Sequence, residues 1–182
     1  MSRYFRPAVD LLAAYARAHR DRRNIQTHVV GVPMMVFAAG VLLSWPALTV
    51  GGWMLTPAWA LLALAALWYL TRGHTALGLS VVVSVAALFF VGQQVSGPGV
   101  VTWLSFGVVP FVLGWLVQMV GHYYEGRRPA SVDSPVNLLV APMFVALELL
   151  SGWRVMRPLA AEVTRRAGPV HVRDLAHPLP QR

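Results

Sequence analysis

Two long apolar blocks dominate the pattern of hydrophobic and polar positions along the chain. Residues 24–71 and residues 73–124 contain no Asp, Glu, Lys or Arg, and Arg72 alone separates them. A helix needs about 20 apolar residues to cross the hydrocarbon core of a bilayer, so each block has room for two spans and a short turn. The pattern predicts an all-α membrane protein with about four transmembrane helices arranged as two hairpins.

Turn residues divide the two blocks into four predicted spans. Gly51 and Gly52 mark the first turn, residues 72–74 the second, and residues 96–99 the third. Tryptophans near the ends of the spans are typical of the membrane–water interface. The predicted spans cover residues 30–48, 57–70, 76–95 and 100–121.

A fifth apolar stretch, residues 136–150, is short for a span and contains Pro142 and Glu148. If it crossed, the arginines that follow it would lie on the opposite side from the other arginines. We expect a re-entrant or interfacial segment, or one packed against the bundle, with Arg128 or Arg154 as the partner of Glu148. The predicted regions are a cytoplasmic amphipathic segment (1–28), a transmembrane helical domain (29–153) and a basic, mobile tail (154–182).

Composition and charge narrow the function classes. The chain is 57% apolar and 12% charged, whereas about 25% of residues are charged in an ordinary soluble domain, so a water-soluble enzyme is not expected. All fifteen basic side chains are arginine and the net charge is +8. Because the arginines gather at the ends of the apolar blocks, we interpret them as topology signals and expect no nucleic-acid partner. By the positive-inside rule we expect the N-terminus on the cytoplasmic side of the membrane. We expect that membrane to be a bacterial inner membrane. The absence of cysteine excludes disulfides and thiolate metal sites.

Histidines are the candidate chemical groups. In the predicted topology His19, His28 and His122 reach one face of the membrane, where Glu125 also lies. His74, in a cytoplasmic turn, is either a solvated loop residue or a fourth ligand. Gln118, His122 and Glu125 are spaced to share one helix face, as are Asn24 and His28. Imidazoles and a carboxylate in this number suit a divalent iron or zinc site, although histidines at a membrane boundary can also be simple anchors.

Two segments resemble a known family. Residues 15–33, YARAHRDRRNIQTHVVGVP, and residues 118–130, QMVGHYYEGRRPA, are similar to the two signature segments of the small membrane 2-hydroxy fatty acid dioxygenases. A weaker similarity covers residues 141–148. The resemblance implies an Fe²⁺ enzyme that uses dioxygen to cleave the bond between carbons one and two of a 2-hydroxy fatty acid. The reaction releases four electrons, which one dioxygen molecule accepts, so it needs no other reductant.

The resemblance also implies roles for particular residues. His19, His28 and His122 match the motif histidines and are the expected iron ligands. Glu125 matches the motif carboxylate, as a fourth ligand, a partner of an imidazole or a proton acceptor. The remaining implied site residues are Asn24 and Gln118 as hydrogen-bond partners, and Arg127 and Arg128 as binders of the substrate carboxylate. The expected partners are a 2-hydroxy fatty acid, dioxygen and membrane lipid. A haem-binding membrane protein and a non-catalytic lipid-binding protein are the alternatives.

Overall fold

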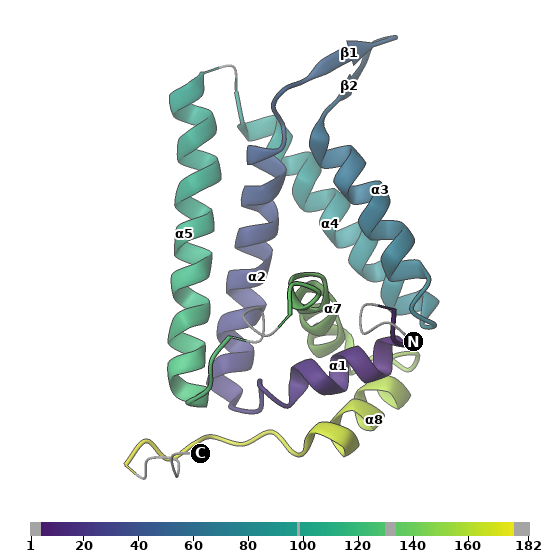
Figure 1. The fold of residues 1–182 in the computed structure, drawn as a ribbon, viewed down its shortest axis with the longest axis vertical. Coiled ribbons are helices and arrows are strands. Elements are labelled where there is room, and N and C mark those ends of the chain that lie inside the picture. Colours follow the sequence, from purple (N-terminus) through teal and green to yellow (C-terminus); the bar gives the residue numbers. More distant parts are fainter. Residues whose placement is uncertain (1–4, 98, 130–133, 177–182) are drawn as a thin grey trace. The chain divides into compact units, whose positions relative to one another are not determined.

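Helices form most of the structure, a computed structural model that describes residues 5–97, 99–129 and 134–176 (Figure 1). The mainly helical fold predicted from the sequence is confirmed, with one addition, a small antiparallel hairpin of β1 (Leu48–Val50) and β2 (Trp53–Leu55). The final six residues of the predicted tail lie outside the described residues. The helices are α1 (Ala8–Ala16), α2 (Arg22–Leu42), α3 (Pro57–Leu70), α4 (Thr75–Val95), α5 (Val100–Glu125), α7 (Asn137–Leu150) and α8 (Arg157–Ala167).

Three of the described helices, α2, α4 and α5, are long and apolar enough to cross a membrane. Helix α3 has the predicted bounds but only 14 residues. At 1.5 Å per residue it is about 21 Å long, less than the roughly 30 Å of a bilayer core. The number of four spans therefore stays a prediction.

The bounds of α2 differ from the predicted span at both ends. Helix α2 begins at Arg22 because Asp21 caps it: the Asp21 carboxylate accepts a hydrogen bond from the backbone N–H of Arg23 at 2.9 Å. The helix ends at Leu42, since Pro46 disfavours helical geometry in the residue before it. Beyond α2, a two-residue turn joins β1 to β2, and its residues Gly51 and Gly52 have φ of +58° and +83°.

The chain groups into two compact units whose boundaries fall inside α2 and α5. We call residues 1–30 with 116–182 the terminal unit and residues 31–115 the central unit. The divisions predicted after residues 28 and 153 concern topology and function along the chain, and they stay predictions.

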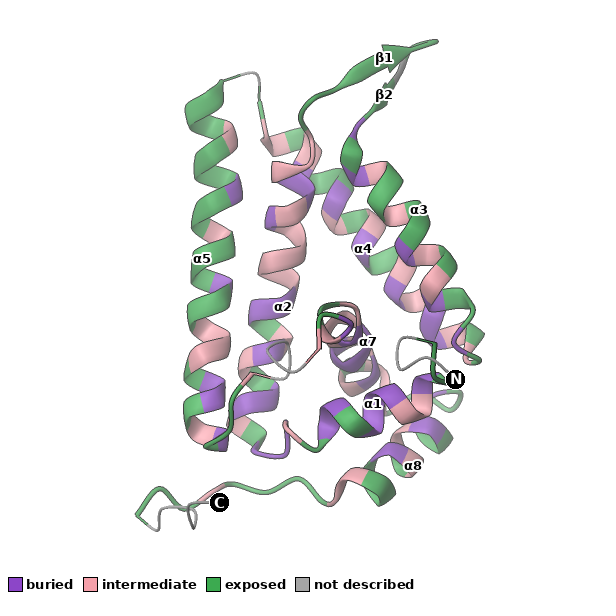
Figure 2. Ribbon diagram, viewed as in Figure 1, coloured by how far each residue is buried: buried purple, intermediate pink, exposed green. Residues whose placement is uncertain are grey.

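Small residues let the helices of the central unit approach closely. A Cβ atom on Gly40 would lie 2.8 Å from Phe89 Cα, and one on Gly114 would lie 2.7 Å from the carbonyl oxygen of Gly31. Close approach at small residues is typical of helix packing in membranes. Much of the apolar surface is exposed, as Figure 2 shows for α5, and only 11% of the apolar window of α5 is buried. Such a surface suits contact with lipid.

The terminal unit has a conventional buried core. Helix α1 packs against α7 and α8 (Figure 1), and Leu12 and Phe144 are fully buried there. Helix α1 lies in the N-terminal segment, and α7 and α8 cover its apolar face. The fifth apolar stretch forms α7, whose side chains pack in this core. Helix α8 places the described part of the tail in the same unit.

Candidate metal centre

His19 lies in the turn between α1 and α2, and its ring is held on both sides. Its Nδ1 donates a hydrogen bond to the carbonyl oxygen of Tyr15 at 2.8 Å. The Tyr15 ring stacks on it, with 4.1 Å between centroids and an interplanar angle of 7°. Because a carbonyl oxygen only accepts, the proton is on Nδ1 and the lone pair is on Nε2. That Nε2 is buried and has no hydrogen-bond partner among the residues that the structure describes.

His28, on the second turn of α2, is oriented in the same way. Its Nδ1 donates to the carbonyl oxygen of Asn24, one turn earlier, at 2.9 Å. This hydrogen bond again leaves Nε2 with the lone pair. A backbone partner that sets the tautomer in this manner is usual for metal-binding histidines.

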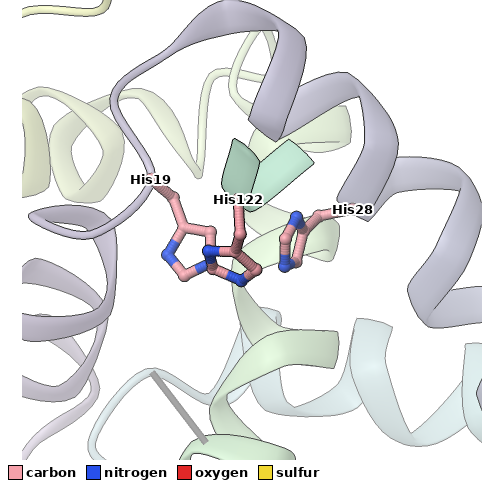
Figure 3. A group of neighbouring side chains, drawn as sticks. All are labelled: His19, His28 and His122. Carbon is pink, nitrogen blue, oxygen red and sulfur yellow. The ribbon is translucent and has the colours of Figure 1, made fainter. Parts of the chain in front are cut away.

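His122, near the end of α5, completes the group (Figure 3). Its Nδ1 is buried and lacks a partner within the described ranges. Its ring centroid is 5.0 Å from each of the other two, which are 4.5 Å apart. One ligand nitrogen from each ring lies within 4.8 Å of the others. The predicted convergence of His19, His28 and His122 is thus present within the terminal unit.

The three imidazoles fit a divalent transition metal. They are at most 6% exposed, and a buried nitrogen lone pair without a partner is unfavourable unless something binds it. Burial, and to a smaller extent the neighbouring His28, holds the pKa of His19 well below its usual value, which favours the neutral form that binds metals. Imidazole nitrogens suit iron, zinc and copper, and three ligands leave positions for substrate. The three-histidine geometry is compatible with each of these metals.

Glu125 supports this centre from the end of α5. Its two carboxylate oxygens accept hydrogen bonds from the backbone N–H groups of Arg20 at 3.0 Å and Asp21 at 2.8 Å. Oε2 also accepts one from the side-chain amide of Asn24 at 3.1 Å. These contacts hold the turn that carries His19 against the helix that carries His122. They favour a positioning role over direct metal binding.

The sequence model of the family described as 2-hydroxy-palmitic acid dioxygenase Mpo1-like matches residues 5–153. The chain belongs to the Mpo1-like family. The family description names a dioxygenase, which agrees with the resemblance found in the two histidine segments. No curated protein and no solved structure matches the chain. The Mpo1-like match contains the three histidines and Glu125 and ends before α8.

Among the other expected site residues of this Mpo1-like chain, Asn24 lies deepest. It is fully buried, its Nδ2 contacts Glu125, and its Oδ1 has no partner among the described residues. Gln118 lies half-buried on α5, one turn before His122. Arg127 is exposed and donates to the carbonyl oxygen of Arg17 at 2.8 Å. The catalytic roles of Glu125, Asn24 and Gln118 stay predictions.

Two expected residues are not part of the three-histidine group. Arg128 is exposed, and its role toward a substrate stays a prediction. His74 belongs to the central unit, where its Nδ1 accepts a hydrogen bond from the backbone N–H of Leu77 at 3.2 Å and caps α4. A cap explains this histidine without a metal.

Sequence reasoning missed Asp21 and the segment that follows α8. Asp21 is fully buried and accepts hydrogen bonds from the Arg23 side chain at 2.8 and 3.0 Å and from the backbone of Arg173 at 2.7 Å. His171 exchanges backbone hydrogen bonds with Arg20 and Arg22, at 2.9 and 2.8 Å. The segment beyond the family match thus fastens the turn that carries His19. A cap residue before an apolar helix was the available signal for Asp21.

The partner of Glu148 also differs from the prediction. Arg20, rather than Arg128 or Arg154, is its nearest described cation, with 4.0 Å between Nη2 and Oε1. Burial raises the pKa of Glu148, and the Arg20 charge opposes that change. Both residues belong to the terminal unit, so the arginines of the tail are not needed to neutralise Glu148.

Proposed function

We propose that this protein is an Fe²⁺-dependent membrane dioxygenase that shortens 2-hydroxy fatty acids by one carbon. The balanced reaction converts R–CHOH–COOH and O₂ into R–COOH, CO₂ and H₂O. The observation that carries the proposal is the buried group of His19, His28 and His122, with two ring nitrogens that have no partner among the described residues. The family description names a 2-hydroxy acid as the substrate.

The three histidines would hold the ion, and hydrogen bonds already orient the rings of His19 and His28 for metal binding. Bound there, Fe²⁺ would supply a positive charge that no ligand neutralises, open positions for the carboxylate and 2-hydroxyl groups of a substrate, and electrons for dioxygen. Hydrogen bonds to the carbonyl oxygens of Tyr15 and Asn24 keep the His19 and His28 rings in the required tautomer.

Aromatic side chains protect the group from water. The Phe144 ring lies 5.6 Å from the His19 ring and 5.2 Å from the Tyr15 ring, measured between centroids, and Phe144 is fully buried. A dry surrounding strengthens the attraction between a bound ion and an anionic substrate, because the local dielectric constant is low. It also limits side reactions of oxygen species with solvent.

The membrane setting suits this substrate class. The histidine group lies beside the start of α2 and the end of α5, both of which are apolar enough to span a membrane. An acyl chain can therefore lie against lipid-facing helices while its carboxylate reaches the imidazoles. By the positive-inside rule we assign this end of the helices to the cytoplasmic side of a bacterial inner membrane.

A turnover and metal assay tests the proposal. The protein, purified in a neutral detergent and stripped of metal, is supplied with Fe²⁺, air and 2-hydroxypalmitic acid. We expect pentadecanoic acid as the product, with one dioxygen consumed per molecule. His122→Ala should lose bound iron and turnover but still insert in the membrane. His74→Asn, which keeps a capping side chain on α4, should retain both.

Several results would count against the proposal. Failure to form the shortened acid across several chain lengths, with iron bound, would remove the dioxygenase function. A Soret absorption band in the purified protein would favour a haem protein instead. Full turnover in His122→Ala would show that the histidine group does not carry the reaction.

A further inference from the structure

A second polar site lies in the terminal unit, beside the turn that carries His19. It is a pocket of about 410 Å³ lined by four arginines, Arg17, Arg20, Arg127 and Arg173, together with Glu125 and residues 167–169 and 171. None of the three metal-centre histidines lines it. The pocket is therefore distinct from the three-histidine group, and Glu125 contributes to both.

The described residues neutralise the positive charge of this pocket only in part. Glu125 lines it, and its two oxygens accept backbone hydrogen bonds from Arg20 and Asp21. The Arg20 guanidinium donates to the carbonyl oxygens of Ala16, His19 and Gly168 and pairs with Glu148 at 4.0 Å. Among the described residues, no carboxylate lies within 4.0 Å of the guanidinium groups of Arg17, Arg127 and Arg173. This excess of positive charge favours an anion in the pocket.

Arg173 and Arg127 add donors that face the same pocket. The Nε atom of Arg173 is buried and has no hydrogen-bond partner within the described ranges, and its Nη1 makes only long contacts of 3.4 Å to two carbonyl oxygens. Within the described part of the chain, Arg127 donates one side-chain hydrogen bond, from Nη1 to the carbonyl oxygen of Arg17, and its other guanidinium N–H groups are available to a ligand. Guanidinium groups bind oxyanions with paired hydrogen bonds, so four of them around one hollow suit a phosphate group.

The position of the pocket along the helices indicates the source of that phosphate. Arg20 comes two residues before α2 begins, and Arg127 comes two residues after α5 ends. These ends lie together, because a Cβ atom on Gly121 of α5 would collide with Thr27 and Asn24 of α2. Where apolar helices leave the hydrocarbon core, their flanking arginines reach the depth of lipid headgroups.

We propose that this four-arginine pocket binds the phosphate of an anionic phospholipid headgroup. The site is independent of iron and of turnover, so its test does not depend on the proposed dioxygenase function. Arg20 directly follows His19, and Glu125 holds both the pocket wall and the turn. A bound headgroup would therefore brace the part of the chain that positions a metal ligand.

The test measures lipid binding to the full chain in a neutral maltoside detergent. Dioctanoyl phosphatidylglycerol is titrated and followed by native mass spectrometry, with dioctanoyl phosphatidylcholine, inorganic phosphate and decanoate as competitors. We expect one saturable phosphatidylglycerol site. Arg17→Gln and Arg127→Gln should each weaken it about tenfold to hundredfold, the loss expected for one hydrogen bond to a charged group. Arg154→Gln removes an exposed arginine outside the pocket and should change it less than about twofold.

Each other outcome overturns the assignment. Equal weakening by all three variants would mean general attraction to net charge. Competition by inorganic phosphate as strong as that by the lipid would make the site one for free phosphate. Preferential displacement by decanoate would make it a carboxylate site. Absence of saturable binding would leave the arginines as topology signals only.

Discussion

The terminal and central units differ in what their helices bury: the terminal unit buries polar and charged side chains, and the central unit buries mainly apolar ones. Among the described residues, every buried histidine and acidic side chain belongs to the terminal unit, and the central unit buries only Arg72 and Thr56 as polar groups. Helices of the central unit meet where glycines face larger apolar side chains such as Phe89 and Leu42. A buried polar centre is stable only if each polar group has a hydrogen-bond partner. Apolar helices need only surfaces that fit closely together.

The two units should therefore fail in different ways. Damage to the terminal unit should first reduce metal binding, because its hydrogen bonds orient the ligands. Damage to the central unit should first reduce thermal stability, because its packing carries no ligand. The first two predictions below test this difference.

The largest effect is expected from Glu125→Gln. The substitution keeps the size of the side chain but turns one acceptor oxygen into an NH₂ group that faces backbone N–H donors of Arg20 and Asp21. The turn that carries His19 should then shift, and metal affinity should fall about 10- to 100-fold, as for other residues that orient metal ligands. Titration of the metal-free protein with Co²⁺, followed by visible absorption, measures this affinity.

A proton-transfer role for Glu125 gives a different result in the same experiment. If Glu125 acts only as a base, Glu125→Gln keeps its Co²⁺ affinity and loses turnover with iron. Glu162→Gln is the control, since Glu162 is an acidic residue of the terminal unit that pairs with Arg165 and Arg166 on α8. It should leave Co²⁺ affinity unchanged.

The second effect is expected from Gly40→Ala in the central unit. The new methyl group would lie 2.8 Å from Phe89 Cα, so α2 must move away from α4, which carries no metal ligand. Overpacking of this kind costs about 1–3 kcal/mol of unfolding free energy. Gly99→Ala is the matched control, because its methyl group meets only the Thr102 side chain, at 3.6 Å.

Thermal unfolding in detergent, with Co²⁺ binding measured at low temperature, separates the two properties. Gly40→Ala should lower Tm and retain Co²⁺ affinity in the folded protein, and Gly99→Ala should change neither. Equal losses of stability and metal affinity in Gly40→Ala would mean that the units do not differ as argued.

The sequence was sufficient for the features that depend on local pattern. The bounds of α3 and the turn at Gly51 and Gly52 follow from apolar runs and glycine, and the histidine group follows from the predicted topology together with the family resemblance. The predicted span begins at residue 30, whereas α2 begins at Arg22, because the first turn of the helix is charged and is capped by Asp21. Long-range contacts could not be predicted from local sequence patterns. The hydrogen bond between Arg173 and Asp21, for example, joins residues 152 positions apart.

The smallest effect is expected from Asp21→Asn, through pH. Burial acts to raise the pKa of Asp21, but hydrogen bonds from Arg23 and from the backbone of Arg173 hold it at about 2. The unfolded value is near 3.9, so the carboxylate contributes stability that is complete above about pH 4 and is lost as the pH falls through 2. Asp21→Asn should therefore be less stable than the original protein at pH 5, with the difference shrinking toward pH 2. Unfolding followed by tryptophan fluorescence measures it, and Arg23→Gln should reproduce part of the effect. If the stability difference between the two proteins stays constant from pH 5 to 2, the charge of Asp21 does not contribute, and the substitution acts only by changing local packing.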